Sequence, residues 1–275
     1  MTSVEDRRAR FRELHDRQQL FVMPNPWDVG SARLLEAAGF GALATTSAGF
    51  AWTLGRRDQE VTRDELVRHV AALAAAISVP LNVDSERCFP DNPGGVGETV
   101  RLLADAGASG VSVEDYDPAG DRIEDLRTAA DRVAAVADAA HGLASPIVVT
   151  GRAENHLHGV DDLDDTIARL VAYRDAGADV LYAPGLTELD RIRRVVEEVQ
   201  VPVNVLALPS GPRVPDLEAA GVRRVSTGGA LARAAYGAAL AGADELRTTG
   251  TARYAAEAPP TASIQAALGS DTPQR

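Results

Sequence analysis

The stretch Asp105-Ala-Gly-Ala-Ser-Gly-Val-Ser-Val-Glu114 joins the end of an amphipathic segment to a short run of β-forming residues. Gly107 suits a helix C-cap, because the left-handed backbone conformation used there costs glycine no Cβ clash. The stretch therefore predicts a helix, a cap and a buried strand in direct succession.

The same succession returns elsewhere in the chain, at Glu36-Ala-Ala-Gly-Phe before Ala42-Leu-Ala-Thr-Thr, at Asp175-Ala-Gly-Ala-Asp before Val180-Leu-Tyr-Ala, and at Glu218-Ala-Ala-Gly-Val before Arg223-Arg-Val-Ser-Thr. Other apolar runs contain proline near their start, where a strand tolerates it because no ladder N–H is needed. These are Val79-Pro-Leu-Asn-Val-Asp, Ser145-Pro-Ile-Val-Val-Thr and Val201-Pro-Val-Asn-Val-Leu, and Phe21-Val-Met-Pro lies at the front of the chain. The strand candidates therefore come to about eight and alternate with helical segments throughout.

The runs are hydrophobic continuously rather than alternately, as in parallel strands covered on both faces. This pattern predicts an α/β fold, a parallel eight-stranded (β/α)₈ TIM barrel. An open doubly wound sheet is the structural competitor, but it usually needs fewer units, and no glycine-rich dinucleotide fingerprint follows the first run.

A chain of 275 residues fits one barrel of this kind. We expect a single catalytic domain over residues 1–268, including helices beyond the eighth strand, and a polar tail over residues 269–275. The Ala-rich segment from Gly229 to Gly242 predicts a helix that packs closely, against another subunit.

The composition excludes several partners. Forty Asp and Glu against 28 Lys and Arg give a formal net charge of −12, which repels nucleic acid and anionic membranes. Cys88 is the only cysteine, so an intrachain disulfide is excluded and no zinc cluster is indicated. Because residues 1–12 are charged and no run is long enough to span a bilayer, we expect a cytoplasmic protein.

Polar side chains at the carboxyl ends of barrel strands point into the active site. They are Asn25, Trp27 and Asp28 after the first strand, Ser47 after the second, Asp84 and Glu86 after the third, Glu114 and Asp115 after the fourth, Arg152 and Glu154 after the fifth, Tyr182 and Asn204 after the sixth and seventh, and Ser226 and Thr227 after the eighth. The acids concentrate on the third, fourth and fifth strands.

Carboxylates gathered in a partly dry pocket repel one another unless a cation lies between them. Oxygen ligands without His or Cys favour Mg²⁺, with Mn²⁺ or Ca²⁺ as alternatives, over zinc. Asp84, Glu86 and Glu114 are the predicted metal ligands, directly or through water. The alternative is that these acids cap the following helices or pair with Arg152.

Several motifs in order resemble the isocitrate lyase/phosphoenolpyruvate mutase superfamily, from about Phe21 to Gly250. They are Asn25-Pro-Trp-Asp28 with Ser31-Ala32, Thr45-Thr-Ser-Ala-Gly49, Arg57-Asp-Gln-Glu60, Asp84-Ser-Glu86, Val113-Glu-Asp115 and Gly151-Arg-Ala-Glu154. An ordered series is far more specific than any one motif.

The resemblance implies a site that stabilises a pyruvate-type enolate with Mg²⁺ and preorganised charge. It implies that Ser47, Ala48 and Gly49 hold the substrate carboxylate, that Asp58 lies in the metal's water shell, and that Arg152 clamps a carboxylate or developing oxyanion. The predicted catalytic residues are Arg152, Asp58 and Glu114. The predicted substrate-binding residues are Trp27, Ser47, Ala48, Gly49, Arg152 and Asn204.

The chain departs from two branches of this superfamily. Isocitrate and methylisocitrate lyases carry a Lys-Lys/Arg-Cys-Gly-His loop, whereas Asp115-Tyr-Asp-Pro-Ala-Gly-Asp-Arg122 here has neither Cys nor His. Phosphoenolpyruvate mutases and phosphonopyruvate hydrolases carry Glu-Asp-Lys, and Tyr116 stands in place of that Lys. We therefore predict a lyase or decarboxylase that cleaves a C–C bond of a small 2-oxo or 2-hydroxy carboxylate.

Two other functions stay open. One is C–P or P–O chemistry on phosphoenolpyruvate or phosphonopyruvate, with Arg122 or Arg87 in place of the missing lysines. The other is a degenerate barrel with a binding role, which the intact acid set disfavours. The resemblance also implies a homodimer or homotetramer in which subunits exchange the last barrel helix.

Other residues near the barrel mouth have plain structural interpretations. Cys88 is expected to pack rather than react, because nearby negative charge raises a thiol pKa. His156 and His158 are left outside the catalytic set as solvated residues of a strand extension. Ser226-Thr-Gly-Gly229 is either a phosphate cradle or a tight strand-to-helix turn.

Overall fold

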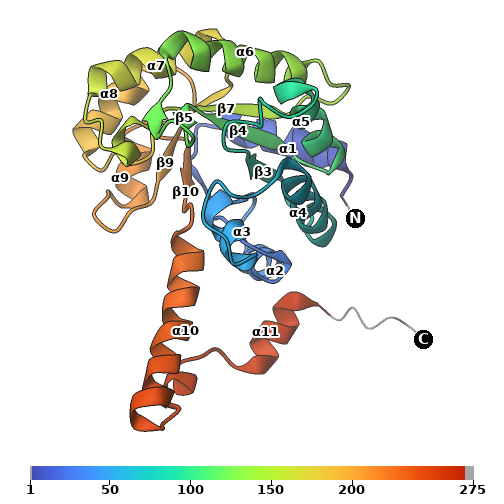
Figure 1. Cartoon of the computed structure of the whole chain (residues 1–275), viewed down its shortest axis with the longest axis vertical. Helices are drawn as coiled ribbons and strands as arrows, with labels where there is room; N and C mark the ends of the chain where they lie inside the picture. The colour runs from blue at the N-terminus through green and yellow to red at the C-terminus, as the bar shows by residue number, and fades with distance from the viewer. Residues whose placement is uncertain (1, 270–275) are drawn as a thin grey trace.

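The computed structural model describes residues 2–269, in which eight parallel strands form a nearly closed barrel surrounded by helices (Figure 1). The barrel strands are β1 Phe21–Met23, β2 Leu43–Ala44, β3 Leu81–Asp84, β4 Gly110–Glu114, β7 Val148–Arg152, β8 Val180–Tyr182, β9 Val203–Leu206 and β10 Arg224–Ser226. They pair in the order β1-β10-β9-β8-β7-β4-β3-β2. The Ala44 N–H donates to the Pro24 carbonyl at 3.1 Å, which links the two ends of this series. The predicted barrel is confirmed.

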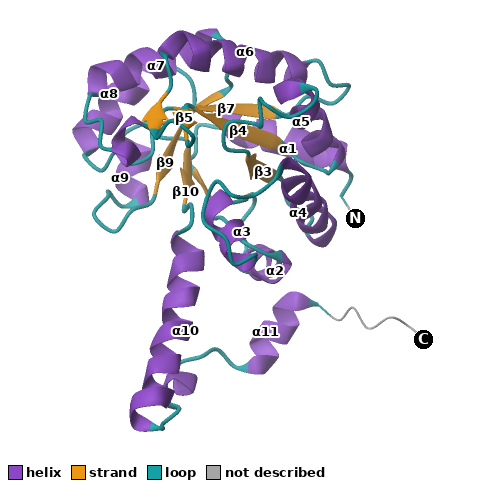
Figure 2. Ribbon diagram, in the orientation of Figure 1, coloured by secondary structure: helices purple, strands orange, loops and turns teal. Residues whose placement is uncertain are grey.

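The helices lie outside the strands (Figure 2). They are α1 Val4–Asp16, α2 Val29–Ala37, α3 Ser47–Thr53, α4 Arg63–Ala76, α5 Gly95–Asp105, α6 Leu126–His141, α7 Leu163–Asp175, α8 Leu189–Val199, α9 Val214–Ala219, α10 Ala230–Thr249 and α11 Thr261–Leu268, with 3₁₀ turns η1 Asn155–His158 and η2 Arg253–Ala256.

The small-residue turns cap helices as expected. Gly107 follows α5 with φ of 101° and Gly177 follows α7 with φ of 103°, a region that side chains with a Cβ rarely adopt. A Cβ at Gly107 would lie 2.8 Å from Ala74 Cβ, so close packing also excludes a larger residue there. Each helix can therefore end at once and feed the next strand.

The core lies between the strands and the helices, and α1 covers the amino-terminal ends of the strands. Phe11 of α1 is fully buried and packs with Met23, Ala44, Val148 and Val180. A Cβ on the first residue of β4 would come within 2.6 Å of the Phe11 ring. One end of the barrel is therefore plugged, and a ligand must enter at the other end.

Two elements extend the barrel. The strands β5 Tyr116–Asp117 and β6 Arg122–Ile123 form an antiparallel hairpin after β4. Helix α10 stands away from the barrel and the chain then returns through α11 (Figure 1). Arg33 of α2 donates to the Leu268 carbonyl at 2.7 Å, which attaches α11.

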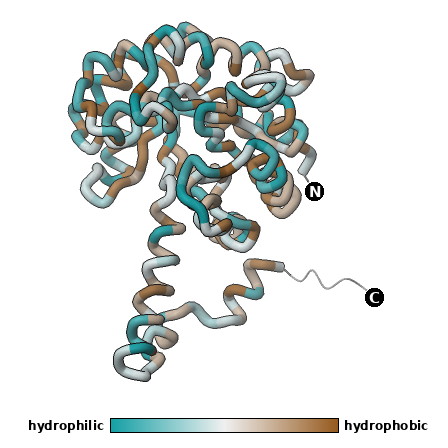
Figure 3. Tube along the Cα trace, viewed as in Figure 1, coloured by the Kyte–Doolittle hydropathy of each residue, from teal (hydrophilic) through white to brown (hydrophobic). Residues whose placement is uncertain are grey.

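Hydrophobic side chains remain exposed on the α10 arm, defined here as residues 230–256. Leu240 is 72% exposed, and Tyr236, Leu246 and Tyr254 are also exposed. Figure 3 shows hydrophobic positions along this helix although it stands clear of the barrel. Within residues 2–269, no helix has the length and apolar character to cross a bilayer. The predicted polar tail covers residues 269–275, and its part beyond Gly269 lies outside the described residues.

Candidate active site

A cavity of about 180 Å³ opens at the carboxyl ends of the barrel strands. Its walls carry six predicted site residues from five separate segments, so the barrel brings together residues that lie up to about 150 positions apart in the sequence. Those lining residues are Ser47, Ala48, Asp58, Asp84, Arg152 and Asn204.

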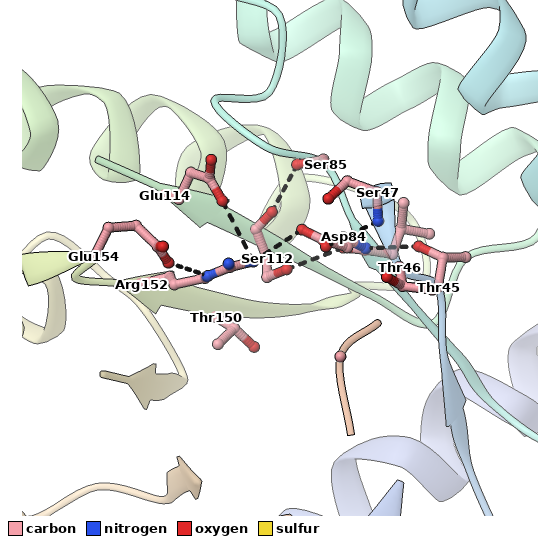
Figure 4. Close-up of polar contacts among 12 residues, drawn as sticks. Thr45, Thr46, Ser47, Asp84, Ser85, Ser112, Glu114, Thr150, Arg152 and Glu154 are labelled. Carbon is pink, nitrogen blue, oxygen red and sulfur yellow. Dashed lines mark hydrogen bonds and ion pairs between the residues drawn. The ribbon is translucent and has the colours of Figure 1, made fainter. Parts of the chain in front are cut away.

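Arg152, the last residue of β7, lies among three carboxylates (Figure 4). Its Nη1 is 3.1 Å from Asp84 Oδ1 and 3.3 Å from Glu114 Oε2, and its Nε contacts Glu154. Its guanidinium carbon also lies 5.3 Å from the centre of the Tyr182 ring. Burial alone would lower the pKa of Arg152, but Glu154, Glu114 and Asp84 together raise it, so the group stays charged.

The acids around Arg152 outnumber the one guanidinium, and the pKa values of Glu86 and Glu114 are raised. Burial raises the pKa of Glu114 well above its usual value, although Arg152 opposes the shift. Burial, then Asp84 and Asp58, raises the pKa of Glu86 to about 8. Burial and the neighbouring Asp84 also raise the pKa of Asp58. The site therefore favours a further cation.

The chemistry of the donor set fits a hard divalent cation. Asp84, Glu86 and Glu114 offer only oxygen ligands, which suit Mg²⁺. Among residues 2–269, no three His, Cys, Asp or Glu side chains gather closely enough to hold a metal by themselves. The fit is therefore to a cation that keeps waters or substrate oxygens in its shell, as Mg²⁺ commonly does.

Asp84 is held at the end of β3 by the segment that follows β2. Its N–H donates to Thr45 Oγ1 at 2.9 Å, and its Oδ2 accepts from the Ser47 N–H at 3.2 Å (Figure 4). Thr46 caps α3 through its side chain, which accepts from the Gly49 N–H. The start of α3 is thereby fixed against the carboxylate that Arg152 contacts.

Four predicted residues do not line the main cavity within the described part of the chain. Glu114 is one of them, and its carboxylate contacts Arg152 and Gln59 beside the cavity. Trp27 packs against Gly49, where an added Cβ would lie 3.0 Å from Trp27 Cβ. Glu86 faces an adjoining hollow that Gln59 and Arg87 also line. The roles of Trp27, Gly49 and Glu86 stay predictions, as does the assignment of all the metal ligands.

The predicted site omitted several residues that hold it in place. Gln59 donates from Nε2 to Glu114 Oε1 at 2.9 Å, from a loop whose approach to β4 no local pattern shows. Asp115 accepts from the Glu154 N–H at 2.9 Å and from Tyr173 Oη at 2.6 Å. The sequence shows Asp115 at the end of its strand and in the Val113-Glu-Asp115 motif, but not that it would hold Glu154 and Tyr173.

The turn after β10 is occupied by a side chain. Asn25 Oδ1 accepts from the Thr227 N–H at 2.8 Å and the Gly228 N–H at 3.0 Å, while Asn25 Nδ2 donates to the Thr45 carbonyl. Because these N–H groups already have a partner, the segment is a tight turn that Asn25 ties to β2, rather than a free phosphate cradle.

The loop after β3 is strained and buries the only thiol. Glu86, Cys88 and Phe89 have φ of 52°, 60° and 51°, a region that non-glycine residues enter at a cost. Cys88 is fully buried in the core, and burial raises the pKa of its thiol to about 12. Cys88 therefore packs, as expected from the sequence.

The expectation for the two histidines was wrong in its geometry. His156 and His158 lie on the 3₁₀ turn η1, not on a strand extension, because Glu154 ends the extended backbone and accepts the His158 N–H. His158 stacks on Tyr116 at 3.6 Å between ring centres. His156 contacts Thr166 Oγ1 at 3.1 Å, so both rings have partners rather than being simply solvated.

The chain is similar to several known proteins. Residues 11–247 match the phosphoenolpyruvate phosphomutase family. A proposed lyase/mutase of Burkholderia cenocepacia J2315 is 51% identical, with a TM-score of 0.90 and 95% of each chain covered. A proposed phosphonomutase of the same strain is 32% identical, with a TM-score of 0.80, over 87% of this chain and 99% of the other. An oxaloacetate decarboxylase of Paraburkholderia xenovorans is 30% identical over 74% of this chain and 69% of its own.

Proposed function

Because the chain belongs to the phosphoenolpyruvate phosphomutase family, within the isocitrate lyase/phosphoenolpyruvate mutase superfamily, we propose that it is a Mg²⁺-dependent carbon–carbon lyase or decarboxylase of a small 2-oxo or 2-hydroxy carboxylate. The observation that carries the proposal is the cluster at the cavity mouth. There, Arg152 bridges Asp84 and Glu114, and burial together with the nearby Asp84 raises the pKa of Glu86, so a cation would stabilise the ionised acids.

Asp84, Glu86 and Glu114 would hold Mg²⁺ directly or through water. The ion would supply Lewis-acid withdrawal of electrons from the 2-oxo group. Arg152 would stay protonated and present its fork of N–H groups to a substrate carboxylate or developing oxyanion, which it orients and stabilises. Asp58, at the cavity mouth, would accept hydrogen bonds from ordered water.

The start of α3 would bind the substrate carboxylate. The Ser47 N–H already donates to Asp84 and the Gly49 N–H to Thr46, so the Ala48 N–H is the donor that supports this role. The Ser47 hydroxyl bonds the Asp58 side chain and would have to turn from it to reach the substrate. Gly49 would contribute by its size, because a Cβ there would lie 2.5 Å from Thr46 Cγ2.

Neither arginine considered as a substitute for the missing lysines supports phosphonate chemistry. Arg87 pairs with Asp117 and Glu124. Arg122 is 73% exposed on the β5–β6 hairpin and lies near Asp117. The contacts of both side chains favour the lyase over C–P chemistry.

The experiment measures Mg²⁺ binding by calorimetry, then the release of pyruvate from oxaloacetate and of phosphate from phosphonopyruvate. We expect Mg²⁺ binding and pyruvate release, and both should be lost in Asp84→Asn. The matched control, Asp216→Asn, removes an acid paired with Arg213 on the surface and should change neither. Phosphate release without pyruvate release would favour the phosphonate reaction, and absence of Mg²⁺ binding would contradict a metal-dependent enzyme.

We also propose a homo-oligomer, a dimer or tetramer, in which α10 packs against a neighbouring subunit. The exposed Leu240 and the small residues along α10 support close helix contact. A cytoplasmic location is proposed with it.

A further inference from the structure

Arg224 of β10 lies at the closed end of the cavity, where its side chain crosses the barrel interior. It is 2% exposed and lines the cavity. Its Nε donates to Asn204 Oδ1 at 2.9 Å, its Nη2 to Thr150 Oγ1 at 3.0 Å, and its Nη1 lies 3.2 Å from His15 Nε2. All three partners are neutral oxygen or nitrogen groups.

This guanidinium has no acidic partner among residues 2–269 within the range of about 4 Å that defines an ion pair. Burial lowers the pKa of Arg224 to about 9, which still leaves it charged at neutral pH. A buried cation without a counter-ion is costly, and arginine has more N–H groups than these three contacts use. The site is therefore suited to an anion.

Arg224 lies one layer of side chains deeper than the acid cluster. Its partner Thr150 precedes Arg152 by two residues on β7, so both point to the same side of the strand, about 7 Å apart along it. Figure 4 shows Thr150 below Arg152 on the same strand. A small diacid bound at Arg152 could therefore reach toward Arg224 with its far end.

A second group at this depth has no partner. Asn82 of β3 is 3% exposed and lines the same cavity, and its Oδ1 forms no hydrogen bond within the described chain. Its Nδ2, the donor that an anion would need, forms no hydrogen bond within residues 2–269 either. Buried carboxamides are normally hydrogen-bonded, so this unpaired group points to a polar ligand or its water.

We propose that Arg224 and Asn82 form an anion subsite at the closed end of the cavity, which binds the far carboxylate of a four-carbon 2-oxo or 2-hydroxy dicarboxylate. Asn204 positions Arg224, because its Oδ1 accepts from Arg224 while its Nδ2 donates to Ser226 Oγ at 2.9 Å. The inference rests on the proposed function, since it places the near end of the ligand at Arg152. It makes the substrate a diacid rather than a monocarboxylate.

The test compares L-malate with L-lactate by calorimetry at saturating Mg²⁺, because the two share a 2-hydroxy acid head and malate adds a far carboxylate. We expect malate to bind at least tenfold more tightly. Arg224→Gln should remove this preference and leave lactate binding within twofold. Arg223→Gln is the matched control, since Arg223 is the neighbouring residue and contacts Gln18 outside the barrel; it should keep the preference.

Oxalate, which has no far chain, separates the two proposals. If oxalate binds but malate and lactate bind within twofold of each other, the subsite is overturned and the proposed function stands. If oxalate, malate and lactate all fail to bind, both are overturned. If Arg224→Gln folds, as judged by circular dichroism, and keeps the preference, the subsite is overturned.

A second variant covers the case in which Arg224→Gln does not fold. Asn82→Asp keeps the side-chain volume and places a negative charge in the subsite. We expect it to reduce the preference for malate at least threefold, and an unchanged preference in this variant would overturn the proposal.

Discussion

Arg152 and Arg224 are both buried arginines on the inside of the same barrel, yet their surroundings are opposite. Arg152 contacts three carboxylates, whereas the contacts of Arg224 are neutral. The group of acids around Arg152 favours a bound cation. The surroundings of Arg224, which contain no acid partner in the described chain, favour a bound anion. The polarity of the cavity thus changes between its mouth and its closed end.

Arg152→Lys tests the role of the guanidinium fork. Lysine keeps the charge but loses the bidentate geometry, so we expect turnover to fall at least tenfold, equivalent to about 1.4 kcal/mol of transition-state stabilisation. The measurement is kcat per folded molecule. Arg7→Lys is the control, because Arg7 of α1 is buried away from the cavity and donates to the Ala74 and Ile77 carbonyls, so it should affect stability alone.

If Arg152 is only a structural ion pair, Arg152→Lys will lower the melting temperature and leave kcat nearly intact. That result would contradict the role assigned to it.

His15 predicts a loss of stability in acid. Burial, followed by Arg224, lowers the pKa of His15 to about 3, although the Phe11 carbonyl opposes this shift. The unfolded chain, with a histidine pKa near 6.5, therefore binds a proton first as the pH falls. The contribution of neutral His15 to the free energy of unfolding is fully present above about pH 6.5 and is lost as the pH falls toward about 3. About 2 kcal/mol of it is lost between pH 7.5 and pH 5.

Urea unfolding at the two pH values measures this loss, and the difference between the native chain and His15→Gln isolates it from other groups. His69, whose pKa burial lowers to about 4, adds a loss of the same sign in both proteins. An equal pH dependence in the native chain and in His15→Gln would refute the assignment to His15.

At the level of elements, the strands were predictable because each follows a turn or proline that local chemistry defines. Gly107, Gly177 and the prolines near the strand starts mark these boundaries. The β5–β6 hairpin was not predicted, because each of its strands is only two residues long, too short for a recognisable pattern. Tyr116 pairs with Ile123 in it. Its stacking on His158 depends on η1, which lies more than thirty residues away.

The part of the candidate site that lies at the ends of strands was predictable from the sequence. The sequence identifies Asp84, Glu114 and Arg152, because barrel topology brings strand ends together. It could not show that Gln59 reaches Glu114, or that Arg224 turns toward the closed end, since loop paths and side-chain directions depend on packing between distant segments.

Gly177→Ala tests whether the helix caps need glycine. At φ of 103°, alanine would be strained, and its Cβ would lie 2.9 Å from Ala137 Cβ. We expect a loss of about 1–2 kcal/mol in the free energy of unfolding, measured in urea.

Gly97→Ala is the matched control, because Gly97 lies inside α5 and its nearest contact would be Ala139 Cβ at 4.0 Å. Alanine there should leave stability unchanged or raise it by up to about 1 kcal/mol. Equal effects of the two substitutions would show that the left-handed backbone is not what selects glycine.

At the scale of the whole molecule, the α10 arm stands apart from an otherwise close-packed barrel. Light scattering at micromolar concentration should give a multiple of 28.9 kDa. Leu240→Glu should shift the protein toward the monomer, because it places a charge in the proposed contact. A native chain that runs as a monomer would rule the assembly out.

Glu197→Gln is the control, because Glu197 is exposed on α8 of the barrel and not on the α10 arm, and it should leave the mass unchanged.

The burial of Cys88 makes the chain ready for site-specific labelling. Its thiol is shielded from reagents and, with a pKa of about 12, is almost entirely protonated at neutral pH. A cysteine introduced on the exposed part of α10 would then be the one that reacts with a maleimide probe. In the proposed assembly, a spin label placed there would report the distance between the arms of two subunits, without any need to replace the native cysteine.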